Sequence, residues 1–167
     1  MKLIVAAAKD WAIGFEGDLL FNLPDDMEFF KSKTMNKIVV MGRPTLLSLP
    51  KGKPLKNRTN IILTSNHSFK GEDCIVRHSM DELFEELKKY NSDDIFIIGG
   101  GKIYNELYPY CSEAYITKVD AIEKADTYLH NFDEDKDWDL IYTSEEFENY
   151  GLKFTFNTYK NSNVIKY

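Results

Sequence analysis

Residues 95–102 are Ile-Phe-Ile-Ile-Gly-Gly-Gly-Lys, an apolar run that passes directly into three glycines. A short, continuous apolar run is typical of a parallel strand covered on both faces. The glycines would end this strand, and a helix would begin at Gly101. Helix N–H groups and bare glycine backbone would then face an anion bound beyond the strand. A tight turn explains a lone glycine triplet about as well, and the run lacks the G-x-G-x-x-G spacing of an ordinary dinucleotide site.

Four more apolar runs have the same continuous character, and they cover Leu3–Ala8, Ile38–Met41, Ile61–Leu63 and Tyr115–Val119. Helices are predicted in the intervening segments, after Pro24, after Pro44 and from Ser79, where Glu82 stands three residues on as in a capping box. This alternation of strands and helices predicts an α/β fold with three layers and a mostly parallel central sheet.

The C-terminal tail has a different pattern. Apolar and polar residues alternate from Leu152 to Asn157, which predicts a strand with one face in water and places Asn157 on that wet face. Asn149-Tyr150-Gly151 is typical of a turn, which would join this strand to the run Leu140–Phe147. We therefore expect an antiparallel hairpin at the C-terminal edge of the sheet.

The connection from Lys9 to Asn22 shows neither the helical nor the strand period, and Gly14 and Gly17 interrupt it. Long connections in compact domains are usually functional lids or disordered segments. This one carries more apolar residues than plain disorder favours, namely Trp11, Ile13, Phe15, Leu19, Leu20 and Phe21. The pattern favours a lid over a binding cleft.

Composition limits the possible functions. The chain has 167 residues, which favours a single domain over 1–167, and its net charge of −6 argues against a nucleic-acid surface. Cys74 and Cys111 are too few for a disulfide scaffold, and no histidine or cysteine spacing indicates a metal site. The N-terminal apolar run is shorter than a signal-peptide core, and no run approaches membrane-spanning length. We expect a cytoplasmic monomer without a metal, nucleic-acid or membrane partner.

Two further strand ends carry residues suited to phosphate. Pro44 fits the first position of a helix, which would seat Arg43 and Thr45 at its N-terminus just after Gly42. Thr64-Ser65-Asn66 brings hydroxyl groups to the end of the third strand. Each segment alone could be a cap or a turn. The carboxyl ends of parallel strands share one edge, so the three segments together predict a long ligand with several phosphates.

Asp26 is the most informative single residue. Asp25 and Asp26 both fall in the first turn of a predicted helix, where the helix dipole favours negative charge, and this explains Asp25. Asp26 also borders an apolar stripe of Leu23, Met27 and Phe30, so its carboxylate should face a cleft rather than bulk water. A lone carboxylate in an apolar pocket suits a ring that presents two parallel N–H donors, such as a pterin.

These motifs resemble those of bacterial dihydrofolate reductase from end to end of the chain, most strongly over Leu3–Ser65 and Ile95–Leu129. The matching segments are Ile13-Gly14, Asn22-Leu23-Pro24-Asp25-Asp26, Phe30-Lys31, Val40-Met41-Gly42-Arg43, Asn60-Ile61-Ile62-Leu63-Thr64-Ser65, Ile98-Gly99-Gly100-Gly101 and Asp126-Thr127. The resemblance implies the fold of that family and an enzyme that reduces 7,8-dihydrofolate to tetrahydrofolate with NADPH. It also implies dihydrofolate and antifolate inhibitors as the small-molecule partners. Hydride would pass from nicotinamide C4 to pterin C6, and N5 would gain a proton.

The resemblance also implies roles around the substrate. Asp26 would be the single ionisable residue at the reacting ring, bonding the pterin N3 and 2-amino group with Thr117 in support. Arg58 would bind the α-carboxylate of the glutamate tail in a bidentate geometry that lysine cannot copy. The other residues expected around the substrate are Ile4, Ala6, Met27, Phe30, Leu49, Leu55 and Ile98.

On the cofactor side, Arg43 and Thr45 would contact the 2′-phosphate and pyrophosphate of NADPH. The resemblance places the rest of the cofactor groove at Ala6, Ile13, Leu19, Gly42, Leu63, Thr64, Ser65, Ile98, Gly99, Gly100, Gly101, Lys102, Ile103, Tyr104 and Thr127. Asp26 would favour N5 protonation electrostatically, while water delivers the proton under control of the lid.

The sequence departs from the family pattern at Phe21, where tryptophan is almost always found, and at Leu20, Leu46 and Ala125. These positions bear on the active-site water and the lid rather than on the fold. Two other functions stay open. The reductase domain of riboflavin biosynthesis shares the fold and NADPH, but Asp26 and Arg58 favour folate. A non-catalytic nucleotide-binding module is the second, and the predicted lid and Asp26 argue against it.

Overall fold

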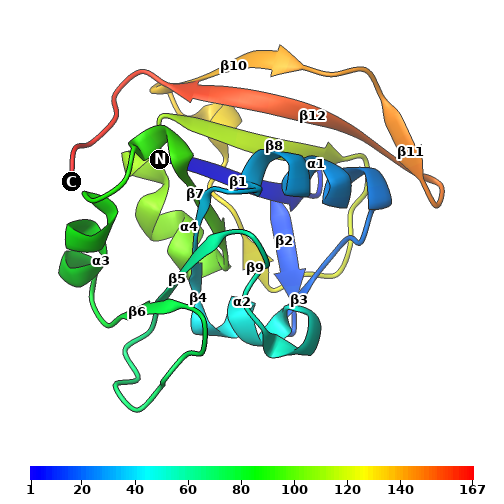
Figure 1. The fold of residues 1–167 in the computed structure, drawn as a ribbon. Helices are drawn as coiled ribbons and strands as arrows, with labels where there is room; N and C mark the ends of the chain where they lie inside the picture. The colour runs from blue at the N-terminus through cyan, green and yellow to red at the C-terminus, as the bar shows by residue number, and fades with distance from the viewer.

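The structure, a computed structural model, describes residues 1–167. The parallel strands are β1 (Lys2–Ala7), β4 (Ile38–Gly42), β5 (Thr59–Leu63), β6 (Ile75–Arg77), β7 (Ile95–Gly99) and β8 (Glu113–Val119). The antiparallel strands are β10 (Trp138–Thr143), β11 (Phe147–Asn149) and β12 (Leu152–Asn161). The parallel and antiparallel strands form one sheet in the order β10-β12-β8-β1-β7-β4-β5-β6, with β11 paired to β12 (Figure 1). The predicted mostly parallel sheet with an antiparallel C-terminal edge is confirmed.

The helices form the two outer layers, and they are α1 (Pro24–Thr34), α2 (Arg43–Ser48), α3 (Met80–Leu87) and α4 (Gly101–Leu107). Single turns of 3-10 helix cover Pro50–Gly52, Ser92–Asp94, Tyr108–Tyr110 and Phe132–Glu134. Apolar residues of α1 and α2 pack on one face of the sheet, and those of α3 and α4 on the other. No helix here combines the length and the apolar composition that crossing a bilayer requires.

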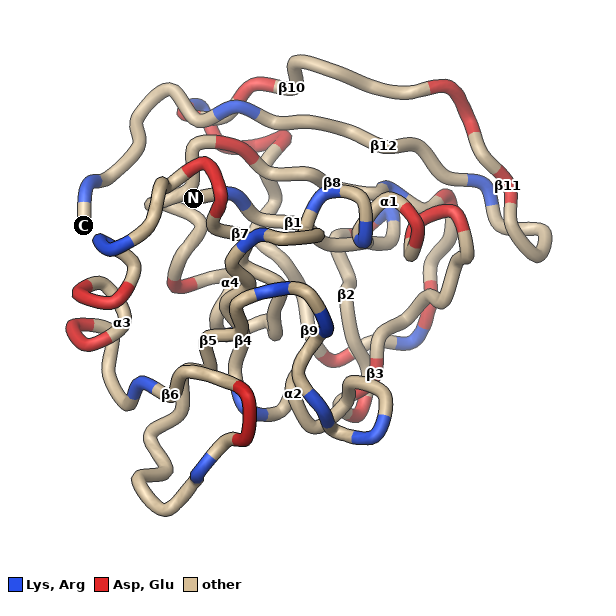
Figure 2. Tube along the Cα trace, in the orientation of Figure 1, with Lys and Arg blue, Asp and Glu red and all other residues tan.

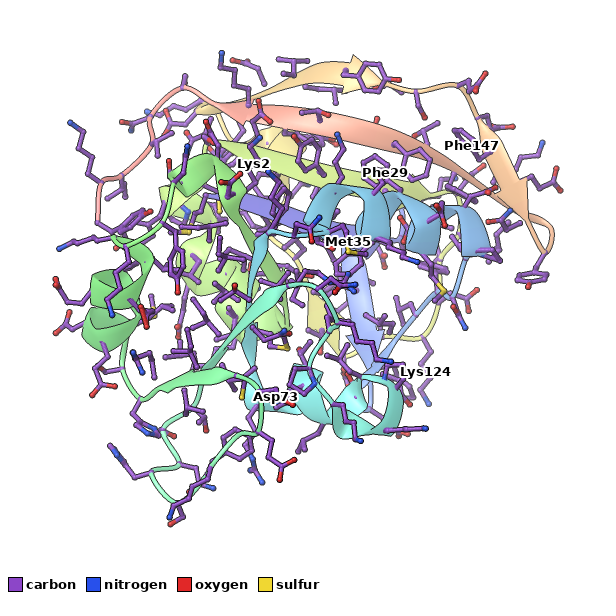
Figure 3. All side chains as sticks on the ribbon, in the orientation of Figure 1. Lys2, Phe29, Met35, Asp73, Lys124 and Phe147 are labelled. Atoms are coloured by element: carbon purple, nitrogen blue, oxygen red, sulfur yellow. The ribbon has the colours of Figure 1, made fainter.

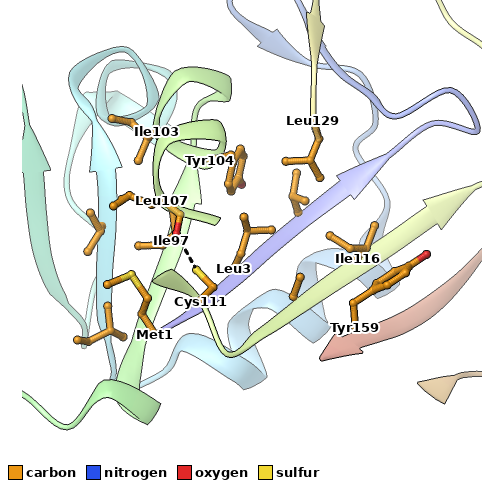
Figure 4. Packing of buried hydrophobic residues seen from close by; sticks show 14 of the residues in the cluster. Met1, Leu3, Ile97, Ile103, Tyr104, Leu107, Cys111, Ile116, Leu129 and Tyr159 are labelled. Carbon is orange, nitrogen blue, oxygen red and sulfur yellow. Dashed lines mark hydrogen bonds between the residues drawn. The ribbon is translucent and has the colours of Figure 1, made fainter. Parts of the chain in front are cut away.

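The continuous apolar runs follow from this double covering. In β4, Val39 and Met41 belong to the cluster under α1 and α2, whereas Val40 belongs to the cluster under α3 and α4. Figure 4 shows the cluster under α3 and α4, where Leu107 and Cys111 pack against the sheet. The Cys111 thiol donates a weak hydrogen bond to the Leu107 carbonyl at 3.5 Å, and burial raises its pKa to about 12. This thiol is therefore a core group and not a nucleophile.

Helix α3 begins as predicted, because the Ser79 hydroxyl accepts the N–H of Glu82 at 3.1 Å. The returning bond of the capping box differs from the prediction. The Glu82 carboxylate accepts the backbone N–H of His78 at 2.8 Å, one residue before the N-cap. Both bonds still satisfy N–H groups that the first helical turn cannot.

The connection between β1 and α1 contains regular structure that its sequence does not reveal. Strands β2 (Ala12–Phe15) and β3 (Asp18–Leu19) form a hairpin, and β2 also pairs with β9 (Thr127–Tyr128) in a separate small sheet. Strands of four and two residues are too short to show a period. The three-residue strand β6 escaped prediction for the same reason.

Strand β12 corrects one prediction about the tail. Asn157 is buried rather than on a wet face. Its amide donates to Thr155 Oγ1 at 3.0 Å and to the Ile116 carbonyl at 3.2 Å, and its carbonyl oxygen accepts the Thr143 hydroxyl at 2.8 Å. A buried amide with these partners is tolerated, so the hydrophobic alternation does not extend past Phe156.

The turn between β11 and β12 is tight, as predicted. Its central residues, Tyr150 and Gly151, have φ of +53° and +79°, and positive φ at both positions is what a type I′ turn requires. Tyr150 is 82% exposed, so its ring adds little packing. A bulky residue at positive φ is strained.

We expect Tyr150→Asn to raise the free energy of unfolding by about 1 kcal/mol, because asparagine adopts positive φ at lower cost. Gly151→Ala should lower it by about the same amount. A Cβ on Gly151 would meet no atom within 4 Å, so only the backbone is affected. Urea denaturation measures both effects. Equal stability of all three proteins would show that the turn is unstrained.

Candidate active site

The three predicted phosphate-binding segments lie side by side. Strand β4 runs between β5 and β7, and the register pairs Gly42 with Leu63 and Met41 with Gly99. The segments that follow these strands therefore leave the sheet at the same edge. At the end of β5, the Thr64 hydroxyl accepts the N–H of Asn66 at 3.2 Å, which makes this segment a turn as well as a polar strand end.

The glycine segment leaves little room for a side chain at Gly99 and none at Gly101. Gly99 has φ of +126°, and a Cβ there would lie 3.2 Å from the Tyr104 ring and 3.4 Å from Thr45 Oγ1. A Cβ on Gly101 would overlap the side chain of Thr127. We call residues 99–101 the glycine loop. Gly99 and Gly101 therefore pack against their neighbours more closely than a residue with a Cβ could.

Tyr104 joins the glycine loop to the centre of the sheet. Its hydroxyl donates to the Ile4 carbonyl at 2.8 Å, and burial raises its pKa above the ordinary value, so the phenol stays protonated. In the same helix, the side chain of Ile103 packs against the end of β4, 3.3 Å from the position that a Cβ on Gly42 would take. Lys102, between the loop and these two residues, is exposed.

Arg43 has one polar atom without a partner. Its guanidinium lies over the ring of Phe69, 5.4 Å from the ring centroid, and its Nε is buried with no hydrogen bond. A buried donor without an acceptor is costly. An anionic oxygen beside the guanidinium would remove that cost, so this end of the groove fits a phosphate.

Asp26 has a single hydrogen-bond donor in the structure. The Thr117 hydroxyl donates to its Oδ1 at 2.6 Å, and Thr117 stands opposite Ala6 in the register of β8 and β1. Burial raises the pKa of the Asp26 carboxyl, and the bond from Thr117 partly offsets that rise. A partly buried carboxyl group with an elevated pKa is a candidate for acid–base chemistry.

The buried face of α1 differs from the predicted stripe. Met27 is 59% exposed, whereas Asp26, Phe30 and Thr34 face inward at intervals of four residues. Leu23 is buried, but it is the extended N-cap of the helix, so helical spacing does not fix its side chain. The predicted stripe treated this residue as helical.

Helix α1 is held in place by aromatic packing and by a pair of hydrogen bonds at its N-terminus. Phe29 lies between α1 and strands β8 and β12 (Figure 3), and its ring stacks on Phe156 with centroids 4.4 Å apart. The Asp25 N–H donates to the Asn149 side chain at 3.0 Å, and the Asn149 amide donates to the Asp25 carboxylate at 2.9 Å. These contacts fix the turn of helix that carries Asp26.

Most of the predicted apolar wall converges under α1 and α2. Ile4 and Ile98 are members of the buried cluster there, and Phe30, Leu49 and Leu55 pack against it. The loop that carries Leu55 is held by Asn60, a buried residue. Its side chain accepts the N–H of Leu55 at 3.0 Å and donates to the Leu55 carbonyl at 2.9 Å.

Arg58 lies at the end of this wall. Its Nη1 donates to the Thr34 hydroxyl at 3.0 Å, and its Nε donates to the Lys56 carbonyl at 2.9 Å. The Thr34 hydroxyl in turn donates to the Phe30 carbonyl, so it is bound on both sides. Burial lowers the pKa of the Arg58 guanidinium. The Nη2 nitrogen makes no hydrogen bond within the protein and can serve an external acceptor.

The segment from Arg43 to Arg58 is basic within an acidic protein. It contains Arg43, Lys51, Lys53, Lys56 and Arg58 and no acidic residue. Figure 2 shows these charges gathered around α2 and the approach to β5, whereas acidic residues cluster on α3. A locally positive field of this kind attracts an anionic ligand although the net charge is −6.

The predicted lid is fastened to the segment before β9. The Asp126 carboxylate accepts the N–H of Glu16 at 2.9 Å, and the N–H of Asp126 donates to the Gly14 carbonyl at 3.0 Å. The bonds from Glu16 and Thr127 lower the pKa of Asp126, so it is ionised at neutral pH. Leu19 pairs with Gly14 in the hairpin and its side chain is 80% exposed. Leu19 is therefore not buried in the groove.

The sequence analysis assigned no role to three supporting residues, Thr34, Asn60 and Asp126, although the last two stand in segments that match the family. Thr34 and Asp126 have partners far along the chain, and Asn60 closes a local loop through Leu55, five residues before it. No local period or spacing marks such a residue. The structure gives Phe21 a packing role. Its side chain is buried with Leu23, Val119 and Phe154, so it contributes to the apolar packing at the base of the lid.

Asp26 should destabilise the fold at neutral pH. Because its folded-state pKa is raised, the folded state holds a proton more tightly than the unfolded chain, and stability falls as pH rises through that window. Asp26→Asn should therefore be more stable than the wild type at neutral pH, by about 1.4 kcal/mol for each unit of the rise. The gain should vanish below about pH 4, where the carboxyl is protonated in both states.

Urea denaturation across this pH range measures the difference. An exposed carboxylate of the same helix provides the control, since Glu28→Gln removes a charge that is not buried. A stability gain from Glu28→Gln equal to that from Asp26→Asn, or no gain from Asp26→Asn, would contradict the burial argument.

Comparisons with known proteins agree with this geometry. The sequence matches the family model for dihydrofolate reductase over residues 1–161. It is 32% identical to dihydrofolate reductase of Bacillus subtilis (strain 168), covering 97% of this chain and 96% of that protein, and 35% identical to the Staphylococcus haemolyticus enzyme, covering 83% and 80%. A solved structure of Enterococcus faecalis dihydrofolate reductase, complexed with NADP(H) and RAB-propyl, superposes with a TM-score of 0.83 at 32% identity, covering 96% and 95% of the two chains. The chain belongs to the dihydrofolate reductase family.

Proposed function

We propose that this chain reduces 7,8-dihydrofolate to 5,6,7,8-tetrahydrofolate with NADPH. The observation that carries the proposal is the partly buried Asp26 carboxyl, bonded by Thr117 at 2.6 Å and bordered by an apolar wall. A pterin presents two parallel N–H donors, which match the two oxygens of one carboxylate. The family assignment supports the same substrate.

The groove across the strand ends fits NADPH by its own chemistry. The glycine loop carries no side chains, so its backbone can approach a pyrophosphate closely. Arg43 offers a buried Nε that lacks an acceptor, which suits the 2′-phosphate. Thr45 and the Thr64-Ser65 pair supply hydroxyl groups along the same edge. When bound, NADPH supplies the hydride.

The chain's own residues bind, orient and assist protonation. Asp26 holds the pterin ring and, when ionised in its apolar surroundings, favours a proton on the ring nitrogen N5. Thr117 fixes the carboxylate orientation, and Arg58 holds the glutamate tail. The lid excludes water while strand β2 is fastened by Asp126. Catalysis therefore rests mainly on positioning and on one buried charge.

The direct test is the oxidation of NADPH on addition of dihydrofolate, followed by absorbance. We expect turnover that depends on both compounds. A protein that binds NADPH but does not oxidise it with dihydrofolate would overturn the proposal and favour a different substrate for the same fold.

Arg43 should set the preference for the phosphorylated cofactor. Arg43→Ala should weaken the binding of NADPH by roughly 1.5–3 kcal/mol, the free energy of a charged hydrogen bond. The use of NADH, which we expect to be poor, should stay nearly unchanged. Steady-state KM values for the two cofactors measure this split. Equal losses with NADPH and NADH would show that Arg43 is structural.

Arg58 should recognise the glutamate tail. We expect Arg58→Lys to raise KM for dihydrofolate and to spare a pterin that lacks the glutamate, because lysine cannot form the bidentate pair. Thr34→Val removes the hydroxyl that holds Nη1 and should produce a smaller effect of the same kind. If both substrates lose equally, Arg58 does not bind the tail carboxylate.

A further inference from the structure

Lys118 has an environment that the proposed reaction does not explain. It follows Thr117 on β8, and because side chains alternate across a strand, it points to the face opposite Asp26. Its Nζ lies 3.3 Å from the Ala8 carbonyl oxygen and 3.4 Å from that of Lys9. The same nitrogen lies 3.7 Å from the centroid of the Trp11 ring. Burial lowers the pKa of the Lys118 amine, so the fold bears a cost for keeping a cation there.

The partners of the Lys118 ammonium, the carbonyl groups of Ala8 and Lys9 and the ring of Trp11, belong to the turn that leads from β1 into the lid. Trp11 has φ of +67°, which is rare for a bulky residue. Its N–H donates to the Ala8 carbonyl at 3.0 Å, and its own carbonyl accepts the N–H of Leu129 at 2.8 Å. The Trp11 ring packs against Phe132 and Tyr159.

The other charged side chains that line a surface depression with Lys118 pair with one another, Lys9 with Asp120 at 2.8 Å and Lys153 with Glu146 at 3.8 Å. The carboxylates of Asp10 and Asp133 raise the pKa of its amine, against the larger effect of burial. Asp133 is engaged elsewhere, since it accepts the Tyr159 hydroxyl at 2.7 Å. The closest partners of the ammonium are therefore two carbonyl oxygens and an aromatic face. A cation satisfies all three at once, and a neutral side chain does not.

This turn determines where the lid meets the glycine loop. Strand β2 begins directly after Trp11, and the Cδ1 atom of Ile13 lies 3.9 Å from where a Cβ on Gly101 would be. The next residue, Gly14, pairs with Thr127, whose side chain fills the space that this Cβ would need. A shift of the turn would therefore carry β2 away from the glycine loop.

We propose that Lys118 is a positioning residue for the cofactor, holding the β1–β2 turn so that strand β2 stays against the glycine loop. The proposal rests on the role of that loop in NADPH binding given under the proposed function. It adds a determinant on the face of the sheet opposite Asp26. Two consecutive residues would then have different tasks: Thr117 orients the Asp26 carboxylate on the substrate side, and Lys118 positions the turn on the cofactor side.

The test compares equilibrium binding of NADPH and NADH to Lys118→Met, Lys118→Arg and wild-type protein. Methionine keeps the length and apolar surface of the side chain and removes the cation. We expect Lys118→Met to bind NADPH and NADH about tenfold more weakly, by the same factor for each, because the 2′-phosphate site is untouched. KM for dihydrofolate at saturating NADPH should change less than about twofold.

Lys118→Arg should restore most of the affinity, since a guanidinium can bond the two carbonyl groups and stack on the ring. The emission of Trp11, isolated in a Trp138→Phe background, should change with Lys118→Met and return with Lys118→Arg. Lys153→Met is the matched control. Lys153 lines the same surface depression of about 260 Å³ but pairs with Glu146 at 3.8 Å, and its loss should leave binding unchanged.

A folded Lys118→Met protein that binds NADPH as wild type does would overturn the proposal, as would a failure of arginine to restore affinity. If the methionine variant does not fold, Lys118→Gln is judged by the same criteria. Because binding is measured without turnover, a wild type that binds NADPH but does not reduce dihydrofolate counts against the proposed function only. A wild type that binds neither cofactor overturns both.

Discussion

The carboxylate of Asp26 is held out of water with one hydrogen bond from Thr117, and the architecture around it follows from that constraint. A desolvated carboxylate raises the free energy of the folded state, so the helix that carries it needs anchors elsewhere. Helix α1 has them in the ring of Phe29 against Phe156 and in the paired bonds between Asp25 and Asn149. Stability supplied by the C-terminal hairpin thus offsets the cost of a reactive group on the first helix.

Strand β8 connects the two halves of the site. It pairs with β1 on one side and with β12 on the other, so its side chains are positioned by the centre of the sheet and by the C-terminal edge at once. Thr117 reaches the carboxylate from one face, and Lys118 reaches the turn before the lid from the other. The basic segment around α2 adds a local positive field, which a protein of net charge −6 needs if it is to attract anionic ligands.

The fold class, the sheet edge and the N-cap of α3 could be predicted because each leaves a local pattern in the sequence. The β2–β3 hairpin and β6 could not, since their strands are too short to show a period. Met27 and Asn157 were misplaced for a different reason. The side-chain direction of Met27 depends on where α1 begins, and the burial of Asn157 depends on hydrogen bonds from other elements. Thr34 and Lys118 have partners that only the folded chain brings together.

The most direct test of the central claim is the turnover of Asp26→Asn with dihydrofolate and NADPH as a function of pH. If the buried charge promotes N5 protonation, the variant should lose about 10²–10³-fold in turnover at neutral pH, as expected for one missing interaction of ~3–4 kcal/mol. It should recover part of that loss in acid, where the substrate arrives already protonated, while NADPH affinity stays close to the wild-type value. Near-normal turnover of a folded Asp26→Asn protein at neutral pH would contradict the account.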